Sequence, residues 1–149
     1  MTQTHIDIGK EVTELQGVFP NISRSDFYQL DNGNEGVAVS YDPVQYQETF
    51  EVLIEYTPSY PDMPPKAWVQ DPTIHPESPH VWGQDDYGDV MICYIDPDDW
   101  RPDLTSYDAA IMIQTWVFAY CNWIEHGTWD WDEKPHGSPD SGLFDLLPF

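Results

Sequence analysis

Cysteine and histidine can act as nucleophiles, proton carriers or metal ligands, and this chain has two cysteines and five histidines. Of the two cysteines, Cys93 sits in the apolar run VMICYI, which follows a loop rich in Gly and Asp. An unpaired cysteine is among the most buried residue types, so spacing alone favours a structural thiol for Cys93, with a nucleophile as the alternative. Cys121 lies inside a longer apolar stretch, and its expected place is the core.

The five histidines, at positions 5, 75, 80, 126 and 136, show none of the CxxC, HxxxH or HExxH spacings of zinc sites. The acidic run Asp96, Asp98 and Asp99 lacks the Gly and the terminal Glu of a calcium loop, so we expect a solvated loop. The sequence also lacks the GxSxG of serine hydrolases and a Gly-rich phosphate loop. We therefore expect neither a metal nor a cofactor.

Charge narrows the range of partners. With 27 acidic and five basic residues among 149, the net charge is −22, which repels phosphate backbones and argues against a nucleic-acid partner. No apolar run is long enough to span a membrane, and the first residues lack the pattern of a secretion signal. We expect a cytoplasmic protein without a membrane partner, with both thiols reduced.

The balance of acidic residues carries a further expectation. The chain has 18 Asp and nine Glu but only three Lys, a balance that a cytoplasm rich in salt would tolerate because salt screens self-repulsion. This favours a halophilic source, and an acidic mesophilic protein is the alternative. Aromatic residues make up 15% of the chain, which excludes the composition of a disordered acidic segment.

The elements that must position these residues follow from periodicity. Apolar residues at Ile8, Val12 and Leu15 predict an amphipathic helix over 6–19, capped by Thr4 or Asp7 and ended by Pro20. Strand-like runs follow in chain order, each as a candidate for one antiparallel sheet: DFYQLD, GVAVSY, TFEVLIEYT and AWVQ. In TFEVLIEYT the apolar residues alternate with Glu51 and Glu55, which predicts a strand buried on one face.

The second half of the chain predicts a long loop and then a long helix. Residues 71–99 are rich in Pro, Gly and Asp, and only VMICYI interrupts them. The segment Thr105–His126 is apolar nearly all round, with a capping box at Thr105 and Asp108 and a stop at Gly127, so it predicts a buried helix. The order predicts an α+β fold: a four-stranded antiparallel meander with helices on one face.

Three marks over residues 59–113 resemble the ubiquitin-conjugating enzyme family. SYPDMPPKAWV is similar to the segment Tyr-Pro-x-x-Pro-Pro that leads into a short strand, and WRPDLT matches Trp-x-Pro-x-Leu-Thr. Between them, Ile92-Cys93-Tyr94 occupies the slot of the catalytic cysteine, seven residues before Trp100. The resemblance implies the ubiquitin-conjugating-enzyme-like fold over 1–135, a C-terminal tail over 136–149, and a thioester-forming transferase that uses Cys93.

The segment TWVFAYCNWIEHGTWDWDEKPH narrows this resemblance to the conjugating-enzyme-like proteins of type II cyclic-oligonucleotide anti-phage signalling (CBASS) operons. Gly127, Trp129 and His136 fit that group, although the order His126-Gly127-Thr128 departs from it. The resemblance implies three partners: an activating enzyme, a modifier protein or the C-terminus of a cyclase as donor, and a nucleotide cyclase as target. The nearly basic-free first helix argues against an activating enzyme of the eukaryotic type.

The chain departs from the larger family near the cysteine. The slot of the supporting Asn, six to eight residues before Cys93, falls on Asp85–Tyr87. His80, thirteen residues before Cys93, is the candidate replacement as oxyanion donor or proton shuttle, and a loop histidine that holds the backbone is the alternative. Nearby carboxylates are expected to raise the thiol pKa. Without the Asn, a catalytically inactive binding module with the same fold remains the alternative function.

Overall fold

The structure is a computed structural model, and it describes residues 6–43 and 46–129. In chain order the elements are α1 (Ile8–Leu15), β1 (Phe27–Gln29), β2 (Glu35–Tyr41), β3 (Phe50–Tyr56), β4 (Lys66–Asp71), β5 (Val81–Gln84), β6 (Val90–Ile92) and α2 (Ser106–His126). Short 3₁₀ turns lie at Arg24–Asp26 and Pro97–Asp99. The tail 136–149 lies outside the described residues.

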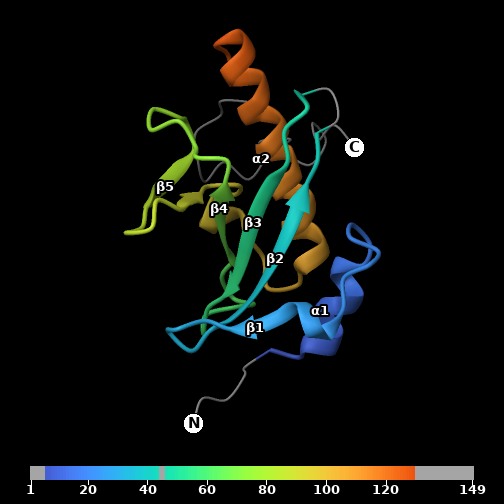
Figure 1. Cartoon of the computed structure of the whole chain (residues 1–149). Helices are drawn as coiled ribbons and strands as arrows, with labels where there is room; N and C mark the ends of the chain where they lie inside the picture. The colour runs from blue at the N-terminus through green and yellow to red at the C-terminus, as the bar shows by residue number, and fades with distance from the viewer. Residues whose placement is uncertain (1–5, 44–45, 130–149) are drawn as a thin grey trace.

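One antiparallel sheet connects the strands of the described chain, in the order β1-β2-β3-β4-β6-β5 (Figure 1). The predicted α+β class and the meander β1–β4 are confirmed. The expected number of four strands is wrong, because residues 71–99, expected as a loop, contain the hairpin β5–β6. Three of the four residues of β5 are exposed, so this strand has no buried alternation by which its sequence could be recognised.

Strand β3 lies near the middle of the sheet and is covered on both faces. Phe50, Val52 and Ile54 are buried as the alternation predicts. The expectation that Glu55 faces solvent is wrong: its carboxylate accepts hydrogen bonds from Asn34 (2.7 Å), Asn32 (2.8 Å) and Trp68 (3.0 Å), and only 4% of the residue is exposed. These three donors replace the water that the carboxylate loses on burial.

The long helix α2 crosses one face of the sheet and supplies much of the core (Figure 1). It begins as predicted, with the Asp108 carboxylate accepting the Thr105 amide at 2.8 Å, and it ends at Gly127, whose φ of 80° suits glycine. Buried residues cover most of its circumference, including Trp116, which is fully buried, while Tyr107 and Gln114 lie on the side that is partly exposed. No helix among the described residues is both long enough and apolar enough to cross a membrane.

A buried polar cluster joins α1 to α2. The Glu11 carboxyl, on α1, accepts hydrogen bonds from the Tyr60 hydroxyl (2.8 Å) and from the Ser106 hydroxyl at the first residue of α2. The Tyr56 hydroxyl lies 2.7 Å from the Ser106 oxygen. Burial and the neighbouring Glu11 carboxyl raise the pKa of Tyr60, so its hydroxyl remains a donor. The predicted helix 6–19 is shorter than expected, and Asp7 is its cap.

Candidate active site

Cys93 directly follows β6, at the end of the β5–β6 hairpin. The ladder pairs Val81 with Ile92, and one step further the Cys93 amide donates to the His80 carbonyl at 2.8 Å. A separation of thirteen residues in the sequence thus becomes a direct backbone contact. The Cys93 thiol turns toward the Ile95 carbonyl, 3.7 Å from its sulfur.

The hairpin explains why counting back from Cys93 does not locate a supporting residue. Asp85 and Tyr87, in the slot of the missing Asn, lie in the turn, at the opposite end of β6 from Cys93. The Asp85 carboxylate accepts the amides of Tyr87 and Asp89, both at 2.9 Å, and Gly88 has a φ of 90°. These residues shape the turn and do not adjoin Cys93 in the ladder.

His80 is held in place by two donors and one ring. Its carbonyl accepts both the Cys93 amide and the indole N–H of Trp116, the latter at 2.9 Å. Its φ of 58° is in the left-handed region, which is uncommon for a residue with a side chain. The imidazole packs on Trp129 with ring centres 5.1 Å apart. The structure therefore brings the His80 backbone to Cys93, and the imidazole to Trp129.

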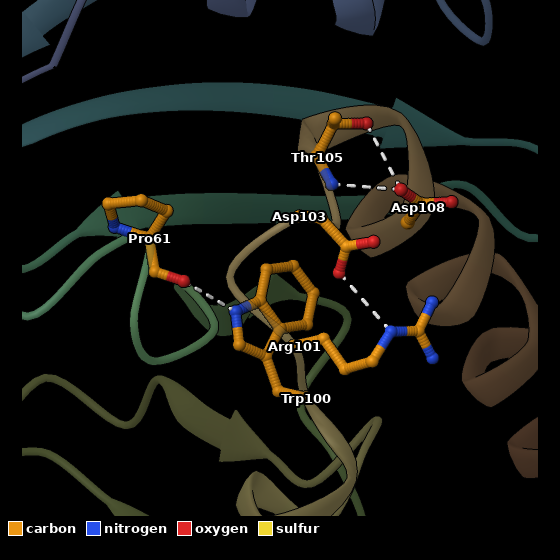
Figure 2. A network of polar contacts seen from close by, with 6 residues as sticks. All are labelled: Pro61, Trp100, Arg101, Asp103, Thr105 and Asp108. Atoms are coloured by element: carbon orange, nitrogen blue, oxygen red, sulfur yellow. Dashed lines mark hydrogen bonds and ion pairs between the residues drawn. The ribbon is translucent and has the colours of Figure 1, made fainter.

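On the other side of Cys93, the motif segments meet. The indole N–H of Trp100 donates to the Pro61 carbonyl at 2.8 Å, which joins WRPDLT to SYPDMPP (Figure 2). The Tyr94 hydroxyl donates to the Pro65 carbonyl, so the residue after Cys93 is tied to the same segment. The Arg101 guanidinium pairs with the Asp103 carboxylate at 3.2 Å, and Figure 2 draws this pair as well. The three marks that are separate in the sequence form one structure around Cys93.

The comparisons with known proteins bear on this arrangement. The family model described as "Type II CBASS E2 protein" matches residues 11–137, most of the chain. The chain belongs to this family. The match covers every helix and strand from β1 to α2, and with them Cys93 and His80. The comparison with curated proteins found no match.

In this CBASS E2 protein the candidate nucleophile is covered and protonated. Only 5% of Cys93 is exposed, and burial, together with the nearby Asp96 carboxylate, raises the pKa of its thiol to about 11. The predicted direction of the shift is confirmed, but burial is a larger cause than the carboxylates. At neutral pH the free protein therefore holds Cys93 as an unreactive thiol.

We expect alkylation of Cys93 by iodoacetamide to accelerate with pH until the thiol ionises near pH 11, since the thiolate is the reacting form. Mass spectrometry of digested protein would follow Cys93 separately from Cys121. The Cys121 thiol is buried too, at 7% exposure, and its pKa is likewise raised to about 11. The two sites should label with similar profiles. Half-maximal labelling of Cys93 below pH 7 would contradict the buried, protonated thiol.

Cys121 and His75 lie apart from Cys93. Cys121 is buried in α2, as expected, and both cysteines are free thiols. The His75 amide donates to the Tyr120 hydroxyl at 2.9 Å, and its ring packs on Trp123, so His75 belongs to the surface near the end of α2. Within residues 6–43 and 46–129, no three metal-binding side chains come together.

Proposed function

We propose that this CBASS E2 protein carries an acyl group on Cys93 and passes it to an amine. The Cys93 thiolate attacks the carbonyl carbon of a donor thioester; a new C–S bond forms, and the donor sulfur leaves as a thiolate that takes up a proton. An amine then attacks the Cys93 thioester, a C–N bond forms, and the sulfur of Cys93 leaves while the amine loses a proton.

The placement of Cys93 between two anchored segments of the matched family is the observation that carries this proposal. The hairpin holds the Cys93 amide from one side through His80, and the Tyr94 hydroxyl holds the next residue from the other side. Family membership implies a conjugation role in anti-phage signalling. A nucleophile on a rigid support meets the requirement for precise positioning of the reacting atoms.

His80 is proposed as the oxyanion donor or proton shuttle of the transfer. The backbone of His80 lies next to that of Cys93, because the Cys93 amide donates a hydrogen bond to the His80 carbonyl at 2.8 Å, and this closeness supports the proposed role. The imidazole packs beside Trp129 and is partly exposed. A rotation about the side-chain bonds of His80 would therefore turn the imidazole away from Trp129. A donor must lie about 3 Å from the developing oxyanion.

The proposed partners follow from the family. An activating enzyme would supply the thioester, the acyl donor would be a modifier protein or the C-terminus of a cyclase, and a nucleotide cyclase would be the target. Lys10 is the basic residue of α1, beside the buried Glu11, so α1 offers little positive charge to an activating enzyme. We also propose that residues 1–135 act as the conjugating domain, with 136–149 as a tail.

The decisive experiment is the co-expression of wild type and Cys93→Lys with the neighbouring genes. A thioester is cleaved by reducing agents and an isopeptide is not, so wild type should show a thiol-sensitive adduct and Cys93→Lys a stable one. Cys121→Ser, a change at the other buried thiol, is the control and should keep the adduct. The absence of an adduct on both wild type and Cys93→Lys would overturn the proposal.

The burial of Cys93 favours one alternative, a catalytically inactive binding module. At 5% exposure and a pKa of about 11, the thiol of the free protein is not poised to react. For catalysis, partner binding must uncover the sulfur and favour its ionised form. The alternative predicts complexes with neighbouring gene products that survive in Cys93→Ser and contain no covalent bond.

We further propose that the protein works in a cytoplasm rich in salt. At a net charge of −22, self-repulsion opposes the compact state, and raising salt from 0.1 M to 1 M shortens the screening length from about 10 Å to about 3 Å. We expect the Tm to rise by more than about 4 °C between these KCl concentrations, as followed by circular dichroism. A constant or falling Tm would favour the acidic mesophilic alternative.

A further inference from the structure

A groove of about 300 Å³ lies beside the candidate active site. Its lining is mostly apolar and comes from the segment after β3, the β5–β6 hairpin and the segment after Cys93. The lining includes Met63, Trp82, Met91, Ile95 and Pro97. Two of the large apolar residues are unusually open to solvent: Trp82 is 55% exposed and Met63 is 41% exposed. Exposed apolar side chains that line one groove are typical of an interaction site.

Trp82 owes its position to the hairpin. Strand β5 is at the edge of the sheet, and its pairing with β6 shifts by one residue between Val81 and Gly83. Such an irregularity re-aims the residue at which it occurs. Tryptophan is highly buried on average, and Trp82 departs from that pattern. Its exposure leaves a large ring available to a partner.

The groove adjoins Cys93 through the neighbours of this residue in the chain. Ile92 and Tyr94, the two residues that flank Cys93, both line it, and Ile95, whose carbonyl faces the Cys93 thiol, lines it as well. A segment seated in the groove would therefore touch the residues on either side of Cys93 and the residue whose carbonyl faces its thiol. This makes the groove suitable for holding a partner at the site of transfer.

Charge selects the kind of partner. Two lining residues have acidic neighbours in the sequence: Asp62 precedes Met63, and Asp96 and Asp98 flank Pro97. Lys66 also lines the groove, but the nearby Glu55 carboxylate opposes its positive charge. Burial alone would raise the pKa of Glu55; its hydrogen bonds and the charge of Lys66 outweigh that effect and lower the pKa. An occupant with basic residues on both sides of an apolar anchor would match this surface.

We propose that the groove binds an extended segment of a second protein, with one apolar anchor side chain against Trp82 and Met63 and flanking Lys or Arg residues near Asp62, Asp96 and Asp98. The anchor supplies apolar burial and the basic residues supply complementarity. Its role in placing a conjugation partner beside Cys93 rests on the proposed function; the binding itself does not require it.

The test uses ¹⁵N-labelled Cys93→Ser protein, so that binding is measured without any thioester. Two peptides serve as probes: acetyl-Arg-Lys-Leu-Lys-Arg-amide and the same peptide with Ala in place of Leu. The Leu peptide should shift the Trp82 indole and the amides of Met63, Met91 and Ile95, and it should bind at least about tenfold more tightly than the Ala peptide, because it buries more apolar surface. Equal binding of the two peptides, or shifts spread over other acidic surfaces, would show general electrostatic attraction and overturn the proposal.

A pair of variants in one hairpin tests the position of the groove. Trp82→Ala should weaken the Leu peptide about tenfold, since it removes the ring that the anchor covers. Tyr87→Ala is the matched control, because Tyr87 is an aromatic residue of the same hairpin, 88% exposed, and outside the lining. Equal losses in both variants, or no loss in Trp82→Ala, would contradict the assignment. If the peptide binds but co-expression yields no adduct, the proposed function fails and the groove stands.

Discussion

Replacing Glu11 with alanine is expected to lower the free energy of unfolding by about 2–4 kcal/mol, a large part of the margin of a domain of this size. Glu11 is 3% exposed and accepts from Tyr60 and from Ser106. Its removal leaves these two buried hydroxyls without their acceptor and opens a space between α1 and α2. Urea denaturation followed by circular dichroism would measure the change.

Two variants make this experiment specific. Glu11→Gln keeps an oxygen acceptor in place and should cost less than Glu11→Ala. Glu14→Ala, on the same helix, removes the same charge without breaking any of the hydrogen bonds described above, and should change the free energy of unfolding by less than about 0.5 kcal/mol. If Glu11→Ala and Glu14→Ala are equally mild, the cluster does not join the two helices.

Removing the imidazole of His80 is expected to slow acyl transfer to an amine by about 10²–10³-fold, the usual cost of losing one oxyanion donor. Because the φ of His80 is 58°, the replacement must tolerate a left-handed backbone. His80→Gly does so and has no side chain. The measurement is the rate at which the preformed Cys93 thioester disappears on addition of an amine, in a single turnover.

The control variants separate the side chain from the backbone. His80→Asn tolerates the same backbone and carries an amide donor, so it should recover part of the lost rate. His75→Ala, at a histidine near the end of α2, should transfer at the wild-type rate. If His80→Gly is as fast as wild type, the role of His80 is limited to the carbonyl that holds the Cys93 amide and the Trp116 indole.

Elements whose patterns report burial were predictable from the sequence. Strands β2, β3 and β4 follow from their buried positions, and the helix α2, with its cap at Thr105 and its stop at Gly127, follows from capping chemistry. The hairpin was not predictable, because β5 is an exposed edge strand whose partners are set by β6 and the turn. The burial of Glu55 was also missed, since its three donors come from distant parts of the chain or a neighbouring strand.

The candidate site shows the same division. The spacing of the flanking motifs was enough to predict Cys93 as the candidate nucleophile. The structure brings these motifs together through the hydrogen bond from Trp100 to Pro61. The contact between His80 and Cys93 depends on the hairpin register, which no local pattern reveals. Trp82 was missed for a different reason: residue type favours burial for tryptophan, and only the irregular edge strand turns this ring outward.

The helix α2 makes hydrogen bonds both to the buried polar cluster at α1 and to the residue that holds Cys93. The hydroxyl of Ser106, in the first turn of the helix, donates a hydrogen bond to the Glu11 carboxyl of α1. Ten residues later, the Trp116 indole donates to the His80 carbonyl, which also accepts the Cys93 amide. At 1.5 Å per residue, about 15 Å of continuous helix separates the two contacts. A displacement of α2 along its axis would therefore move the Trp116 indole relative to the His80 carbonyl that holds the Cys93 amide.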